Sequence, residues 1–187
     1  MNAETLLCPP EEAAVRLLGA NIVAGAVVAR IIEVEAYGGR DDPASHAFGG
    51  RTPRNGSMFG PAGTMYVYVS YGIHDCANVV CGPEGEPSAV LIRAVEVLQG
   101  IGLVERRRGR GVPGGRLIGP GRTCQGLGIH RGHDGLCLFN PASPVQLHEG
   151  VGTIGGRVRE GTRVGISKAT ELPWRFQWEP SGEVLEK

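Results

Sequence analysis

Two glutamates, two positions apart, have the residue type and spacing to do chemistry. Glu33 and Glu35 alternate with apolar residues before Tyr37, and in a β-strand the side chains at i and i+2 share a face. The three polar side chains therefore share one face of a predicted strand. Such a face is usually the solvated side of a sheet. A carboxylate fixed in a pocket can instead stabilise positive charge and take a proton from water.

The tyrosines of the chain are concentrated around and after these glutamates. All four lie between positions 37 and 71, and Tyr66 and Tyr68 share a face of one predicted strand. Tyrosines on half-buried strands often belong to the core. As a set beside a carboxylate strand, they suit a pocket that sandwiches a flat ring. Bases taken out of a duplex are held by aromatic stacking of this kind.

Three further polar residues could complete such a pocket. Asn78 can donate a hydrogen bond to an acceptor on a base, and Arg93 can bind a phosphate or a carboxylate. His46, in a long loop, could donate to a phosphate or a sugar. Each of these residues alone is more often structural. The only lysines, Lys168 and Lys187, lie outside the aromatic segments, so simple hydrolysis is favoured over a lysine Schiff base.

Two other functions fit part of this pattern. Residues i and i+2 of a strand lie roughly 6.5–7 Å apart at Cα, within reach of the carboxylate separations of sugar hydrolases. A glycoside hydrolase would need both Glu33 and Glu35, but Trp174 and Trp178, which could form a sugar platform, lie far along the chain. A DNA- or RNA-binding domain without activity would use the tyrosines equally well. A carboxylate in its pocket would repel phosphate.

Charge is unevenly distributed along the chain, although the net charge of its 187 residues is zero. Positions 106–133 contain seven arginines and no acidic residue, whereas positions 33–42 contain four acidic residues. A phosphate-binding surface beside a carboxylate site would have this distribution, and a solvated arginine loop is the alternative.

Metal-binding, secreted and membrane proteins are poorly supported classes. The five cysteines are odd in number and lack zinc spacing, so we expect reduced, mostly buried thiols in a cytoplasmic protein. His130 and His133 have no acidic or thiol partner close by, and we expect no metal there. The start of the chain lacks the apolar core of a signal peptide, and no stretch is long enough to span a bilayer.

The helices and strands predicted around these residues indicate an α+β fold in one domain over residues 1–187. Glycine, at 31 residues, exceeds twice its usual share of ~7%, which indicates many tight turns. The predicted strands follow one another, which favours a mainly antiparallel sheet. Helices are predicted at 10–18, 98–108 and 120–127. Strands are predicted at 27–37, 64–71, 76–81, 89–97, 136–139, 145–148 and 157–166, with a long loop at 38–63 and a loose tail after position 178.

In order, these segments resemble the alkyladenine DNA glycosylase family, also called 3-methyladenine DNA glycosylases. The sequence Ile-Glu-Val-Glu-Ala-Tyr at 32–37 is similar to the family's E-x-E-A-Y motif. The resemblance continues along nearly the whole chain, and chance is a poor explanation for an ordered series. Its further segments are 45–46, 49–55, 58–59, 63–68, 71–72, 78, 91–94, 119–122, 124–125, 163–166 and 174–176.

The resemblance implies a monofunctional base excision repair enzyme. Such an enzyme hydrolyses the N-glycosidic bond of alkylated or deaminated purines, such as 3-methyladenine and hypoxanthine, flipped out of double-stranded DNA. The family uses no metal or redox cofactor, and we expect a monomer. Its fold is one mixed domain around a curved sheet, with a protruding β-hairpin that enters the minor groove.

The same resemblance implies a role for individual residues. Glu35 matches the general base that prepares the attacking water, and Arg93 matches a residue close to it. Tyr71 matches the tyrosine at the hairpin tip that fills the gap in the duplex. The positions that match pocket residues around the flipped base are Tyr37, His46, Tyr68 and Asn78. The other expected DNA contacts are Met58, Ile73, His74 and Arg122; at 73 and 74 better-known mammalian relatives carry larger side chains.

Overall fold

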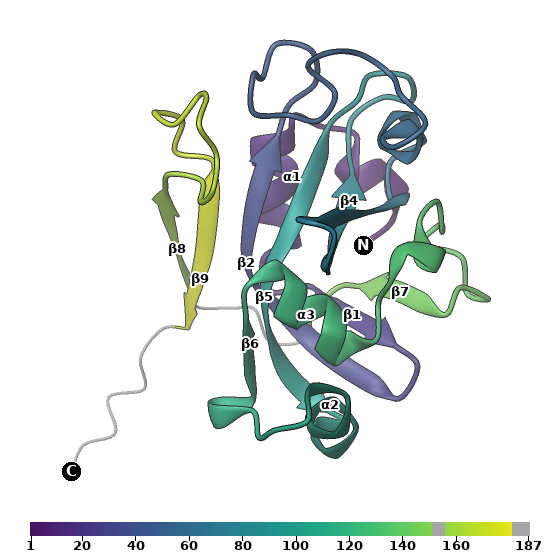
Figure 1. Cartoon of the computed structure of the whole chain (residues 1–187), viewed down its shortest axis with the longest axis vertical. Coiled ribbons are helices and arrows are strands. Elements are labelled where there is room, and N and C mark those ends of the chain that lie inside the picture. Colours follow the sequence, from purple (N-terminus) through teal and green to yellow (C-terminus); the bar gives the residue numbers. More distant parts are fainter. Residues whose placement is uncertain (151–155, 181–187) are drawn as a thin grey trace.

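A curved antiparallel sheet runs through the protein and carries the candidate site (Figure 1). The structure is a computed structural model that describes residues 1–150 and 156–180. Its two longest strands, β2 (Val27–Tyr37) and β5 (Ala89–Gln99), pair with each other along the middle of the sheet. Both strands are rich in β-branched residues, which pack well on a pleated surface. Their inward side chains form much of the main core.

The other strands extend this central pair on both sides, and every strand pair is antiparallel. The order β3-β4-β5-β2-β1-β7 forms the main path, while β6 pairs with β5, and β9 pairs with β2 and β8. The predicted α+β class with a mainly antiparallel sheet is therefore confirmed. The bounds of these strands are β1 (Asn21–Ala24), β3 (Met65–Ser70), β4 (His74–Val80), β6 (Arg116–Ile118), β7 (Val145–His148), β8 (Gly156–Gly161) and β9 (Arg175–Pro180).

Strand β2 changes its partner where the two glutamates lie. One edge of β2 pairs with β5, while the other edge pairs with β1 over residues 27–30 and with β9 over residues 33–35. The register with β5 shifts on both sides of Glu33. Such irregularities bend a strand and re-aim its side chains, and they are frequent beside functional sites. Simple alternation therefore fails to describe this part of β2.

Three α-helices lie in the described part of the chain (Figure 1). Helix α1 begins with a proline in its first turn, followed by two glutamates that suit the positive end of the helix dipole. It packs on β2 through Ala13, Ala14 and Leu17. Helix α3 packs on β4 and β5, and α2 packs on α3. The helices are α1 (Pro10–Leu17), α2 (Ile101–Arg108) and α3 (Pro120–Leu127), with short 3-10 helices η1 (Ala3–Leu6), η2 (Gly56–Phe59), η3 (Pro113–Gly115) and η4 (Arg131–His133).

Strands β3 and β4 form the expected hairpin. Ser70 pairs with His74, and the N–H of Ile73 donates to the carbonyl of Ser70 at 3.1 Å. The two central residues of this turn, Tyr71 and Gly72, have φ angles of 50° and 72°. Positive φ at both positions is typical of the tight turns that join twisted strands. Glycine adopts it freely, whereas at Tyr71 it is strained.

Several predicted elements are wrong. The predicted strands do not include β1, β6 or β9: runs of four and three residues in β1 and β6 are too short for a periodic signal, and β9 extends into the predicted tail. Residues 136–139 form no strand: Leu136 and Leu138 accept isolated backbone hydrogen bonds from Met65 of β3 and Leu147 of β7, and Cys137 makes a single bridge to Thr64. Strand β8 ends at Gly161 rather than 166. Residues 179–180 belong to β9 instead of a loose tail, whose remainder at 181–187 lies outside the described residues.

All five cysteines carry free thiols, and three of them are buried. None of the helices within 1–150 and 156–180 has the length and apolarity needed to cross a membrane.

Candidate active site

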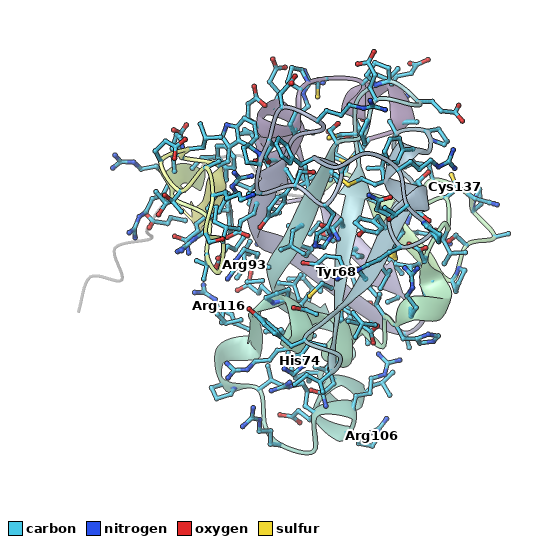
Figure 2. All side chains as sticks on the ribbon, turned by 45° about the horizontal axis from the view of Figure 1, so that its top comes forward. Tyr68, His74, Arg93, Arg106, Arg116 and Cys137 are labelled. Carbon is cyan, nitrogen blue, oxygen red and sulfur yellow. The ribbon has the colours of Figure 1, made fainter. Side chains whose placement is uncertain are left out.

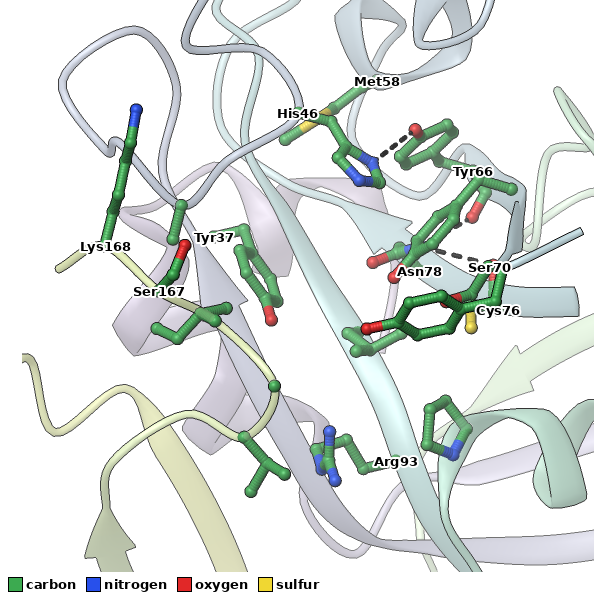
Figure 3. A pocket seen from close by; sticks show the side chains of 18 of the residues that line it. Tyr37, His46, Met58, Tyr66, Ser70, Cys76, Asn78, Arg93, Ser167 and Lys168 are labelled. Atoms are coloured by element: carbon green, nitrogen blue, oxygen red, sulfur yellow. Dashed lines mark hydrogen bonds between the residues drawn. The ribbon is translucent and has the colours of Figure 1, made fainter. Parts of the chain in front are cut away.

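A cavity of about 660 Å³ opens beside the end of β2 (Figure 3). Segments that are far apart in the sequence form its wall: the end of β2, the loop 38–63, the β3–β4 hairpin, the middle of β5, the start of α3 and the loop 164–168. Its volume lies within the range of small-ligand sites. The lining side chains that matter below are Tyr37, His46, Arg54, Met58, Tyr66, Tyr68, Tyr71, Asn78, Arg93, Val164, Ser167 and Lys168.

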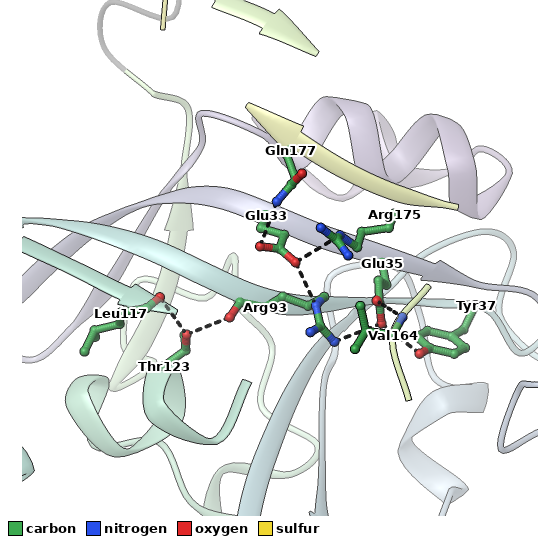
Figure 4. Close-up of polar contacts among 9 residues, drawn as sticks. All are labelled: Glu33, Glu35, Tyr37, Arg93, Leu117, Thr123, Val164, Arg175 and Gln177. Atoms are coloured by element: carbon green, nitrogen blue, oxygen red, sulfur yellow. Dashed lines mark hydrogen bonds and ion pairs between the residues drawn. The ribbon is translucent and has the colours of Figure 1, made fainter. Parts of the chain in front are cut away.

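Glu35 lies directly behind this wall and is held by three residues that line the cavity (Figure 4). Its Oε1 accepts a hydrogen bond from the N–H of Val164 at 2.7 Å. Its Oε2 accepts from the Tyr37 hydroxyl at 2.9 Å and from the Arg93 guanidinium at 3.3 Å. The side chain has 0% of its surface exposed. The solvated outer face that strand alternation alone favours is therefore wrong for Glu35.

Glu33 is held by a different set of partners. Its Oε1 lies 2.9 Å from Nε of Arg93 and 3.3 Å from Nε of Arg175, and its Oε2 accepts from Gln177 at 3.2 Å. In the described structure, Arg93 lines the cavity and Glu33 does not. Arg93 thus bridges the two carboxylates, and only Glu35 lies next to the cavity wall. A sugar hydrolase needs two carboxylates that flank its substrate, so this arrangement counts against that function.

The protonation of the residues around Glu35 follows from their surroundings. Burial, and then the charge of Glu35, raise the pKa of the Tyr37 hydroxyl above its usual value. Burial opposes the charge of Arg93, yet Glu35 and Glu33 raise the pKa of Arg93 overall. Tyr37 therefore stays a hydrogen-bond donor and Arg93 stays a cation across the neutral pH range.

Val164 is held in place by a buried ion pair at the preceding residue. The Arg163 guanidinium binds both carboxylate oxygens of Asp42, at 2.6 and 2.9 Å, and donates to the carbonyl of Ala36 at 3.0 Å. It also lies over the ring of Tyr37, 4.8 Å from the ring centre. The side chains of Arg163 and Asp42 are 0% and 2% exposed. This pair fixes the 162–168 loop against the end of β2.

Aromatic rings form the wall on the hairpin side of the cavity (Figure 3). The His46 ring stands edge-on to Tyr68 at 4.5 Å between centres, and His46 Nδ1 lies 2.9 Å from the Tyr66 hydroxyl. Asn78 is buried and donates from Nδ2 to the Tyr66 carbonyl at 3.0 Å. Met58, expected as a DNA contact, is only 1% exposed and packs in the small core beneath these rings. The structure thus brings all the predicted pocket residues together around one cavity.

His46 is expected to be neutral at pH 7. Partial burial of its ring, and then the nearby charge of Arg54, lower the pKa of His46 below 6.5. A titration followed by the NMR signals of the imidazole should therefore give a midpoint below 6.5. Replacing Arg54 with alanine removes one of the two causes and should raise the midpoint. A midpoint above 6.5 in the wild-type protein would contradict this assignment.

The hairpin tip projects away from the sheet. Tyr71 is 90% exposed and Ile73 is 74% exposed, far more than other large apolar side chains in the described residues. His74 is exposed as well, but its ring lies against α3: a Cβ added at Gly121 would lie 2.9 Å from His74 Cγ. Arg122, the next residue of α3, is exposed. The tip therefore places Tyr71, Ile73 and His74 beside the first turn of α3.

The arginine-rich segment continues this basic surface. Arg106, Arg107 and Arg108 end α2, where positive charge suits the helix dipole. Burial, and then the charges of Arg110 and Arg122, lower the pKa of Arg108. In Figure 2, Arg106, Arg116 and His74 lie toward the α2–α3 end of the molecule. These arginines follow the side of the protein on which the hairpin tip lies.

Sequence reasoning missed some residues that build the site. Lys168 was placed away from the pocket, because it lies about one hundred positions after the tyrosines, yet it lines the cavity. Asp42 gave no signal and Val164 gave no periodic one, since their contacts span 121 and 129 residues. Arg163 and Val164 lie in a segment that carried the family resemblance, which was the one available signal. Among the described residues, no group of three side chains could hold a metal ion, and the His130 and His133 rings pack on each other.

Comparison with known proteins identifies the family of this chain. The family model described as methylpurine-DNA glycosylase matches residues 4–181. A relative from Nocardia farcinica, named as a 3-methyladenine DNA glycosylase, is 46% identical over 191 residues, covering 99% of this chain and 90% of the relative. Relatives with the same name are 48% identical in Mycobacterium tuberculosis, covering 94% of this chain and 88% of the relative, and 51% identical in Frankia casuarinae, covering 86% and 80%. The chain therefore belongs to the methylpurine-DNA glycosylase family of DNA N-glycosylases.

Proposed function

We propose that this protein removes alkylated and deaminated purines of the 3-methyladenine and hypoxanthine class from double-stranded DNA by hydrolysis. The observation that carries the proposal is the Glu35 carboxylate, fixed by Val164, Tyr37 and Arg93 behind a cavity walled with aromatic rings. The cavity is large enough for a flipped nucleotide, and its rings suit stacking on a flat base.

In the proposed reaction, Glu35 is the general base. The C1′–N bond breaks with its electron pair on the base, while a water oxygen forms a bond to C1′ and gives a proton to Glu35. A cationic alkylated purine leaves as a neutral base, whereas hypoxanthine leaves as an anion that takes up one proton from water. The carboxylate also stabilises the positive charge that develops on the sugar. Because Glu35 has no exposed surface, the water must enter between Tyr37, Arg93 and Val164. The products are a free base and an abasic sugar.

The remaining predicted residues bind the substrate in this proposal. Tyr37, His46, Tyr68 and Asn78 surround the flipped base, and Met58 supports this wall from inside. The exposed side chain of Tyr71 fills the gap in the duplex, flanked by Ile73 and His74. Arg122 and the arginines of α2 bind backbone phosphates on the same side. The strain at Tyr71 supports a functional role, because exposed strained residues bring the fold no stability.

Base release tests the proposal directly. Purified protein is mixed with duplexes that contain one 3-methyladenine or one hypoxanthine, with EDTA present, and the free base is measured against an undamaged duplex. We expect release from a damaged duplex and an abasic product that stays uncut until alkali is added. Tight binding without release from either lesion would favour a binding domain, and strand cutting by the protein before alkali is added would contradict a monofunctional enzyme.

A further inference from the structure

Lys168 stands at the rim of the cavity, on the loop that holds Val164. We infer that Lys168 binds a backbone phosphate of the extruded nucleotide and so anchors it while the base occupies the pocket. This inference rests on the proposed function, because it assumes a flipped nucleotide in the cavity. It concerns the substrate's backbone rather than its base.

The position of the ammonium group favours phosphate over the base. The Lys168 side chain is exposed, and its Nζ lies over the ring of Phe48, 5.8 Å from the ring centre. Phe48 is itself 48% exposed, so the pair sits at the surface. In the view of Figure 3, Lys168 and Arg93 lie on opposite sides of Tyr37, and the lysine extends away from Arg93. The charge is therefore held at the mouth of the cavity rather than beside Glu35.

Charge pairing supports the same role. The ion pairs in the described part of the chain engage many of its cations, but none involves Lys168. Arg54, another cation that lines the cavity, is also without a carboxylate partner in that range and lies over the ring of Tyr68, at 5.7 Å. Lys168 and Arg54 thus both lie over aromatic rings at one cavity and have no carboxylate partner among the described residues. Their charges can therefore attract an anion.

The loop around Lys168 is built to present this side chain. Ala169, the next residue, has a φ of 48°, which is strained for a residue with a Cβ. Its carbonyl accepts from the Arg163 guanidinium at 3.4 Å, so the buried Arg163–Asp42 pair holds the loop at both ends. Ser167 lines the cavity beside Lys168 and offers a hydroxyl donor. Strain that the surroundings impose at a binding rim is typical of preorganised sites.

Salt dependence of binding tests this role. Equilibrium binding to a duplex with one tetrahydrofuran abasic site is measured from 50 to 300 mM salt for wild type, Lys168→Ala, Lys168→Arg and Arg159→Ala. Each phosphate contact contributes about 0.9 to the slope of log Kd against log salt. Lys168→Ala should lower the slope by about this amount and weaken binding roughly fivefold at low salt. Lys168→Arg should keep the slope, and Arg159→Ala, which removes an exposed charge on β8, should leave it unchanged.

A second measurement locates the phosphate. Neutral methylphosphonates replace the phosphate on the 5′ or the 3′ side of the abasic site. On one of these two duplexes the effect of Lys168→Ala should disappear, because the contact is already lost. The inference would be overturned if Lys168→Ala weakened binding to both methylphosphonate duplexes as much as it weakens binding to the unmodified one. A salt slope of Lys168→Ala equal to that of wild type would also overturn it. Trapping of wild type, but not of Lys168→Ala, on natural abasic DNA by borohydride would also overturn it, since Lys168 would then act as a nucleophile.

The two proposals can fail separately. The abasic duplex contains no base to release, so the binding slope of Lys168 can be read whether or not the protein is active. Failure of wild type to release any base would overturn the proposed function, whereas normal release with an unchanged slope in Lys168→Ala would overturn only the phosphate contact. Thermal unfolding of each variant should match wild type, because the side chain is exposed.

Discussion

Glu35→Gln should lower the single-turnover rate of base release by about a thousandfold or more. General base catalysis contributes roughly 10²–10⁴-fold, and charge stabilisation at a buried site contributes a similar factor. Glutamine keeps the size of the side chain, but its single oxygen can accept from only one of Val164 and Tyr37, which donate to different oxygens of Glu35. It removes the negative charge and the basic oxygen, which the chemistry needs. Rates are measured with enzyme in excess over a duplex that carries one lesion, so that binding does not limit release.

Glu33→Gln is the matched control for this prediction. Glu33 touches Arg93, Arg175 and Gln177 but does not line the cavity. It acts on the reaction only through the position of Arg93, so we expect a loss of roughly tenfold or less, with the remaining activity still dependent on Glu35. Equal losses in both variants would favour the two-carboxylate chemistry of a sugar hydrolase. A Glu35→Gln enzyme near the wild-type rate would contradict the mechanism.

The parts of the site that the sequence predicts are those built by local patterns. The bounds of β2 are as predicted, because a long run of β-branched and alternating residues is a strong signal. The alternating strands of the hairpin follow for the same reason, whereas α3 begins with a proline in its first turn. The surroundings of Glu35 could not be predicted in this way. The bulges around Glu33 arise in its pairing with β5, and the pairing with β9 joins residues more than 130 positions apart.

The same limit explains the error about Lys168. Sequence distance separates Lys168 from the tyrosines, but the loop after β8 leaves the sheet at Gly161 and returns to the end of β2. A strand predicted through 166 would have placed Val164 in the sheet. What redirects the chain is the Arg163–Asp42 pair, a contact across 121 positions that periodicity does not reveal. The types of these residues can be read from the sequence, but the residues that they contact cannot.

Asp42→Asn should destabilise the fold by about 3–5 kcal/mol, the usual cost of leaving one charge of a buried ion pair alone. Arg163 has no exposed side-chain surface and would lose a carboxylate that binds it through two oxygens. For a chain of this length, that cost corresponds to a fall in Tm of about 10 °C. Base release below the new Tm should also fall, mainly through kcat, because Val164 would no longer be held against Glu35.

The acid dependence of stability gives this prediction a second readout. Burial alone would raise the pKa of Asp42, but the hydrogen bonds from Arg163 and from the N–H groups of Ala44 and Gly38 lower it overall. A carboxyl group whose folded pKa is lowered stabilises the fold above its unfolded pKa of about 4 and loses that contribution as the pH falls through the folded value. Wild type should therefore lose stability below about pH 4 more steeply than Asp42→Asn. Asp41→Asn, a change at the exposed neighbouring residue, should match wild type in Tm and acid dependence, and an Asp42→Asn protein as stable as this control would refute the role of the pair.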